Sequence, residues 1–161
     1  MKLLNSKKNS YLFLFLILIC SCNYKPLFDK DQLGKFTVKN IETSGDKRIA
    51  QMTINKLNII KSQTGNYNLF VYADKNISVS NKSSTGKVLE YSITLNYKIE
   101  AKNNLTGEKI YSKKTSRTEN YKSSNLYSDT INNEKKIIEN MSNLVAKQTV
   151  NEIILVLQND I

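Results

Sequence analysis

The sequence predicts an α+β fold, a two-layer sandwich in which two helices cover one face of a four-stranded, mostly antiparallel sheet. The clearest evidence is residues 91–101, where six alternate positions are apolar and polar residues lie between them. Two other stretches carry apolar residues at helical spacing. Because these signals follow the order strand, helix, strand, strand, strand, helix, we expect one domain over residues 34–161.

The first strand and the first helix are predicted in the N-terminal part of this domain. Apolar and polar residues alternate in residues 35–41, which predicts the strand. Residues 46–62 then present one broad apolar face at helical spacing, opposite lysines and asparagines. Asp46 is the expected N-cap of this helix, and Gly65 is the expected residue just beyond its C-terminus.

Three strands are predicted in the middle of the chain. Alternation from residue 67 to residue 79 predicts a long strand, with a bulge expected near residues 74–76. A polar turn leads to the strand at residues 91–101. A hairpin loop at residues 103–107 then leads to a more polar strand at residues 109–121.

The chain is expected to end in a long amphipathic helix. Ser123 or Ser124 is its predicted N-cap. Its predicted core stripe consists of Ile138, Met141, Val145, Thr149, Ile153 and Val156. With both helices on one side, the other face of the sheet carries polar residues of the strand at 91–101. This second face is predicted either to be solvated or to meet a partner in a polar cavity.

Composition excludes several classes of function. The chain has 161 residues, no His and only two Cys. The missing His removes Ser-His-Asp and Cys-His catalysis and His-ligated metals, and two Cys cannot complete a four-ligand zinc site. We therefore expect a binding or structural module, with no enzyme activity, no metal and no cofactor.

The N-terminus has the pattern of a secretory signal. Lys2, Lys7 and Lys8 precede an unbroken apolar run at residues 11–19. A membrane-spanning helix needs roughly 20 apolar residues, whereas the apolar core of a signal peptide has about 7–15. Residues 1–21 are therefore predicted to be a signal peptide.

The residues around Cys22 resemble a bacterial lipobox, the site at which a lipoprotein precursor is cleaved and acylated. Ile19 and two small residues precede Cys22, which is the predicted site of lipidation. Acyl chains contribute about 0.8 kcal/mol per buried methylene, so two or three chains anchor a protein durably. Residues 22–33 are then a tether. Asn23, in place of an aspartate, favours the outer membrane.

The charge balance is strongly basic. Lys and Arg total 24 and Asp and Glu total 14, a net charge of +10, and removal of three signal-peptide lysines leaves +7. A secreted, membrane-tethered protein does not meet nucleic acid, so no nucleic-acid partner is predicted. Two interpretations stay open: most lysines solvate the surface, or they attract an anionic lipid surface or a phosphorylated glycolipid.

Several short patterns together resemble one family. Residues 22–28 (CNYKPLF) look like the mature opening of the LPS-assembly lipoprotein family LptE, and the other matching positions are Arg48, Gln51, Asn55, Leu57, Thr106, Gly107, Asn120, Tyr121, Ser124 and Tyr127. The resemblance covers essentially all of residues 22–161. The chain departs from the family pattern at Asn23, where Gly is usual, at Thr53, where Leu is common, and in a last helix rich in Ile, Asn and Lys.

The resemblance implies a function in the cell envelope. A member of this family would plug the outer-membrane LPS-export barrel LptD, assist its assembly and help to insert lipopolysaccharide into the outer leaflet. The candidate contacts to lipopolysaccharide phosphates are Lys82, Lys87, Lys113, Lys114 and Arg117. The alternatives are solvated turn and edge-strand lysines, an auxiliary lipoprotein of another lipid transport system without a barrel partner, and a structural lipoprotein of the cell envelope.

Overall fold

The computed structural model describes residues 36–159. The predicted signal peptide, Cys22 and the tether therefore lie outside the described residues. In chain order the elements are β1 (Thr37–Gly45), α3 (Lys47–Leu57), β2 (Ile60–Lys61), β3 (Tyr67–Lys82), β4 (Val88–Asn103), β5 (Lys109–Lys122) and α4 (Tyr127–Asn159).

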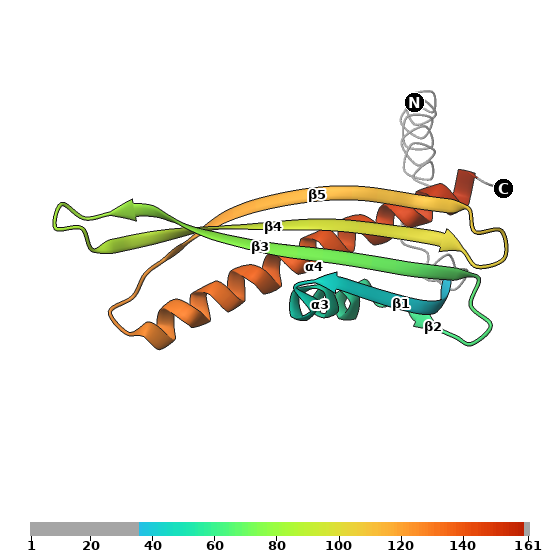
Figure 1. Cartoon of the computed structure of the whole chain (residues 1–161), viewed down its shortest axis with the longest axis horizontal. Helices are drawn as coiled ribbons and strands as arrows, with labels where there is room; N and C mark the ends of the chain where they lie inside the picture. Colours follow the sequence, from blue (N-terminus) through green and yellow to red (C-terminus); the bar gives the residue numbers. More distant parts are fainter. Residues whose placement is uncertain (1–35, 160–161) are drawn as a thin grey trace, which may run out of the picture.

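The strands form one sheet with the order β2-β1-β3-β4-β5. The long strands β3, β4 and β5 pair antiparallel, whereas β1 pairs parallel with both β2 and β3. Helices α3 and α4 pack together on one side of this curved sheet (Figure 1). The predicted α+β sandwich and its element order are confirmed. The two-residue strand β2 is an addition to the four strands expected.

The first helix ends earlier than the sequence predicted. Asp46 is its N-cap, and its carboxylate accepts hydrogen bonds of 3.1 Å from the backbone N–H groups of Arg48 and Ile49. The helix ends at Leu57 because Asn58 adopts the left-handed conformation, with φ 52°. Residues 59–62 then run beside β1, and β2 pairs with β1 as the edge strand of the sheet.

Gly65 is therefore not at a helix terminus. It lies against β1, and a Cβ added at this position would come within 2.5 Å of the backbone N of Lys39 and the carbonyl carbon of Val38. Gly65 lets the chain pass close to the neighbouring strand before β3 begins. In the sequence alone, a glycine in this role looks the same as a glycine that ends a helix.

The bulge expected near residues 74–76 is absent. The register between β3 and β4 is continuous from Tyr67 to Val79, and the irregularity lies between Val79 and Lys82. The polar residue in the middle of this stretch is Lys75, which points toward α4 and pairs with Glu134 at 2.8 Å. An ion pair with the helix interrupts the apolar pattern without breaking the strand.

The core lies between the sheet and the two helices. The alternation in β4 is confirmed, since Ile93, Leu95, Tyr97, Ile99 and Ala101 are buried and Tyr91 is half-buried. The predicted stripe of α4 is also buried, except for the half-buried Val156.

The start of α4 differs from the prediction. The helix begins at Tyr127, after both predicted caps, and the backbone N–H of Ser124 donates to the Thr130 hydroxyl at 2.8 Å. The serines therefore belong to the turn that precedes the helix.

Candidate functional site

The sheet has two chemically different faces. We call the side that packs on α3 and α4 the helix face, and the opposite side the open face. In β4, Leu95 and Tyr97 point to the helix face and are buried, while Asn96 and Lys98 point to the open face and are partly exposed. No described helix lies over the open face (Figure 1).

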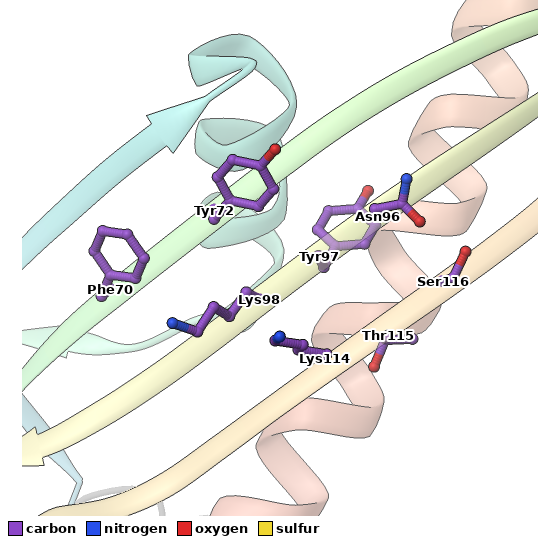
Figure 2. A pocket seen from close by; sticks show the side chains of 8 residues that line it. All are labelled: Phe70, Tyr72, Asn96, Tyr97, Lys98, Lys114, Thr115 and Ser116. Carbon is purple, nitrogen blue, oxygen red and sulfur yellow. The ribbon is translucent and has the colours of Figure 1, made fainter.

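The open face is hollowed near its centre. The hollow has a volume of about 610 Å³, and Figure 2 shows side chains from three adjacent strands around it. We call it the open-face hollow; its residues are Phe70 and Tyr72 on β3, Asn96 and Lys98 on β4, and Lys114 and Ser116 on β5, with Tyr97 and Thr115 between them completing the lining.

Strand register places a tyrosine and two lysines in one row across the hollow. Tyr72 is opposite Lys98, and Lys98 is opposite Lys114. Like charges directly opposite each other on neighbouring strands are destabilising. Lys98 is partly compensated by Glu100, at 3.2 Å, whereas Lys114 takes part in no ion pair within residues 36–159. The hollow therefore carries a positive charge that the described residues do not neutralise.

Asp74, exposed and opposite Asn96, borders this row on one side, and Glu100 borders it on the other. Its Oε1 accepts from Lys109 at 3.0 Å and from Ser112 at 3.1 Å, in addition to pairing with Lys98. The Lys109 hydrogen bond, helped by those of Lys98 and Ser112, outweighs burial and lowers the pKa of Glu100 to about 2. The carboxylate is thus ionised at neutral pH, and its single negative charge is already shared by two lysines, Lys98 and Lys109.

Two aromatic residues give the hollow an apolar wall. Phe70 is half-buried and Tyr72 is 36% exposed, although both lie on a face otherwise rich in polar residues. The alternation of β4 predicted a polar open face, and these two rings were not expected on it. The available signal was four consecutive apolar residues, 69–72, because such a run makes both faces of a strand apolar.

The five predicted phosphate contacts do not form one cluster. Lys82 ends β3 and Lys87 lies in the β3–β4 turn, where its Nζ donates to Asn125 Oδ1 at 2.7 Å. Lys113 and Arg117 point to the helix face, and Arg117 Nη2 donates to Gln148 at 3.1 Å. Lys114 alone among the five lines the open-face hollow.

Lys113 already has an internal partner on α4. Its Nζ donates to Glu152, which also accepts from Tyr111 Oη at 2.8 Å and Gln148 Nε2 at 3.1 Å. Burial raises the pKa of Glu152, but the hydrogen bonds from Lys113, Tyr111 and Gln148 outweigh it and the pKa is lowered overall. Burial and this carboxylate together raise the pKa of Tyr111. Lys113 therefore contributes to the packing of β5 on α4.

Within residues 36–159, no three His, Cys, Asp or Glu side chains are grouped so as to hold a metal ion. The described helices also include none that is both long enough and apolar enough to cross a membrane. The open-face hollow, with its rings and unneutralised lysine, is the feature of the described domain best suited to bind a ligand.

No protein-family model matches the chain, and no curated protein matches it in sequence. Solved structures do share its fold. Rare lipoprotein B from Shewanella oneidensis is 14% identical, with 75% of this chain and 98% of that one covered and a TM-score of 0.56. A candidate lipoprotein from Caulobacter crescentus CB15 is 11% identical, with 82% and 96% covered and a TM-score of 0.59. The described domain thus has a fold that occurs in bacterial lipoproteins.

Proposed function

We propose that this protein is an outer-membrane lipoprotein that plugs an LptD-type LPS-export barrel, assists its assembly and helps to insert lipopolysaccharide into the outer leaflet. The observation that carries the proposal is the combination of a lipobox-like pattern at Cys22 with a domain whose fold occurs in bacterial lipoproteins. The resemblance of residues 22–28 to the mature opening of the LptE family adds the identity of the barrel partner.

The chemistry of the two faces supports a position inside a polar lumen. The interior of a large outer-membrane barrel is polar, so a plug needs an outer surface that tolerates water and hydrogen-bonding neighbours. On the open face, Thr94 and Thr118 share a 2.8 Å hydrogen bond between their hydroxyls, and Asn120 donates to Ser80 at 3.3 Å. Such a surface meets polar barrel strands without leaving a large apolar area unmatched.

The predicted lipopolysaccharide contacts differ in the internal contacts that each would lose on binding a phosphate. Lys114 is exposed and makes no ion pair within the described domain, so it binds a phosphate without losing an internal contact. Lys113 would first have to leave Glu152, and Arg117 would have to leave Gln148. Lys82 and Lys87 are exposed at the far turn and would reach a different part of a large ligand.

Purification of the full chain from its own outer membrane in mild detergent tests the proposal. We expect an equimolar complex with one large β-barrel protein, and we expect depletion of the protein to reduce surface lipopolysaccharide. The variant Cys22→Ala should lose its membrane association while the domain remains folded. A solitary molecule, with surface lipopolysaccharide unchanged on depletion, would overturn the assignment.

Two other functions make different predictions in the same experiment. An auxiliary lipoprotein of another lipid transport system would copurify with transporter subunits and no large barrel. A structural lipoprotein of the cell envelope would be retained with cell-wall polymer after detergent extraction. The sequence pattern at residues 22–28 favours the barrel partner over both.

A further inference from the structure

The open-face hollow combines two features that seldom occur together on a solvated sheet. Phe70 and Tyr72 supply ring faces on one side, and Lys98 and Lys114 supply ammonium groups beside them (Figure 2). Exposed aromatic rings give apolar contact area with few rotatable bonds, and each tyrosine also offers a hydroxyl for hydrogen bonding. An aromatic wall next to a cationic wall matches a ligand that has a ring at one end and an anion at the other.

The charge balance indicates which anion fits. Lys98 and Lys114 are directly opposite each other, and Glu100 lies on the Phe70 side of this row. Because Glu100 has one negative charge and already pairs with both Lys98 and Lys109, the positive charge of Lys114 is left over. An anion between the two lysines would relieve their repulsion, and a phosphate presents oxygens that two compact ammonium groups can share.

The other residues that line the hollow indicate which kind of ring the ligand has. Asn96 and Ser116 lie opposite each other on β4 and β5, next to the row of lysines, and both offer polar groups to the hollow. An aromatic face on one side and amide and hydroxyl groups on the other suit a hydroxylated ring, which has both C–H surface and O–H groups. A volume of about 610 Å³ also lies within the usual range of ligand sites, about 300–1,000 Å³.

We infer that the open-face hollow binds a phosphorylated sugar, with the ring against Phe70 and Tyr72 and the phosphate between Lys98 and Lys114. This inference rests on the proposed function for the source of the ligand in the cell, a glycolipid headgroup. It assigns to the open-face hollow a role that only Lys114 of the five predicted phosphate contacts shares, and it adds three residues, Phe70, Tyr72 and Lys98, to the binding site.

The test is an NMR titration of the full acylated chain in detergent micelles with glucose 6-phosphate, glucose and inorganic phosphate as three separate probes. We expect glucose 6-phosphate to shift the ring signals of Phe70 and Tyr72 and to bind about tenfold more tightly than either of the other probes. Phe70→Ala should lower the affinity for glucose 6-phosphate and leave the affinity for inorganic phosphate unchanged. Equal binding of inorganic phosphate and glucose 6-phosphate, with unshifted ring signals, would overturn the inference.

Lys114→Glu and Lys122→Glu form a matched pair of charge reversals. Both lysines are exposed on the same face of β5, eight residues or about 26 Å apart along the strand. Lys114→Glu should lower the affinity for glucose 6-phosphate by about tenfold or more, while Lys122→Glu should leave it unchanged. The new carboxylate in Lys114→Glu would face Lys98, so the fold is expected to be retained. Equal effects of the two reversals would show a nonspecific charge effect and overturn the inference.

Two further arms separate this inference from the proposed function. Vesicles containing a phosphorylated glycolipid should displace bound glucose 6-phosphate if the ligand is a headgroup, and should leave it bound if the ligand is a free sugar phosphate. Barrel copurification is measured in parallel on the wild type and on Lys114→Glu. In the wild-type protein, barrel copurification without sugar-phosphate binding refutes the inference alone, and loss of the barrel in Lys114→Glu would make an acidic segment of the barrel the occupant.

Discussion

The two faces of the sheet use charged side chains in opposite ways. On the helix face, β3 and β5 each send a lysine to a specific partner on α4, as Lys75 does to Glu134 and Lys113 to Glu152. On the open face, Lys98 and Lys114 face each other, and Lys114 has no ion pair within the described domain. Charges on the helix face fix the packing of α4, whereas Lys114 on the open face remains available to a ligand.

Adjacent residues in β5 show this contrast most clearly. Lys113 and Lys114 are chemically identical and consecutive, but strand alternation sends them to opposite faces. One is held by the Glu152 cluster and the other lines the hollow. A lysine in a strand therefore cannot be assigned a role from its local sequence without knowledge of which face its neighbours cover.

The largest expected effect comes from deleting a core side chain on the helix face. Leu95 is fully buried, and Leu95→Ala should lower the free energy of unfolding by about 2–5 kcal/mol, because the substitution removes buried methyl groups and leaves a cavity. The neighbouring open-face change Thr94→Ala loses one exposed hydroxyl contact and should cost less than about 1 kcal/mol. Urea denaturation measures both. Equal losses would contradict the two-layer assignment of β4.

Glu100 tests whether a buried acid of the open face is held as tightly as its contacts indicate. Its pKa is lowered from 4.5 to about 2, so the folded state gains stability above pH 4.5 and loses it as the pH falls from 4.5 toward 2. At pH 7, Glu100→Gln should cost about 1.5–3 kcal/mol, since it removes charged hydrogen bonds to Lys109 and Lys98.

The same variant should lack much of the acid-induced loss of stability. Urea denaturation at several pH values between 2 and 7 measures this difference. Glu42→Gln, at an exposed acid on the same face, is the control at pH 7 and should change the free energy of unfolding by less than about 0.5 kcal/mol. A parallel acid profile in the wild type and Glu100→Gln would refute the assignment.

The neighbouring lysines of β5 should differ by a smaller amount. Lys113→Ala leaves Glu152 and Tyr111 without one of their partners and should cost about 1 kcal/mol, as expected for a partly exposed ion pair. Lys114→Ala should change stability by less than about 0.5 kcal/mol, because it removes repulsion from Lys98 and no ion pair. Thermal or urea unfolding distinguishes them, and a larger loss for Lys114→Ala would reverse the assignment of the two faces.

Most of the fold was predictable because its elements have strong periodic patterns. The alternation in β4 and the apolar stripe of α4 are long enough to specify both type and burial. Failures occurred where one tertiary contact replaced a local rule. Asn58 ends α3 by adopting a left-handed conformation. Gly65 allows the chain to pass close to β1. Lys75 interrupts the apolar pattern of β3 because it pairs with Glu134 on α4.

The candidate site was less predictable because it depends on three strands that are distant in sequence. Lys114 was among the predicted contacts, but its row with Tyr72 and Lys98 exists only after the strand registers are known. The sequence also carries no sign that Lys113 is occupied by Glu152, which lies 39 residues away. Charge alone therefore could not separate the lysines that pack against α4 from the lysine that lines the hollow.

The smallest expected effect concerns the far end of the same sheet. Lys82 and Lys87 flank the β3–β4 turn, about 33 Å along β4 from Lys98, and their double replacement by Ala should change stability by less than about 0.5 kcal/mol. The affinity for glucose 6-phosphate should also stay unchanged, because the hollow is untouched. Affinity for intact lipopolysaccharide should fall if the turn holds a second phosphate of the same large ligand. A drop in glucose 6-phosphate affinity would mean that the turn and the hollow are one coupled site. The ligand-binding part of the open face would then extend along the whole of β4.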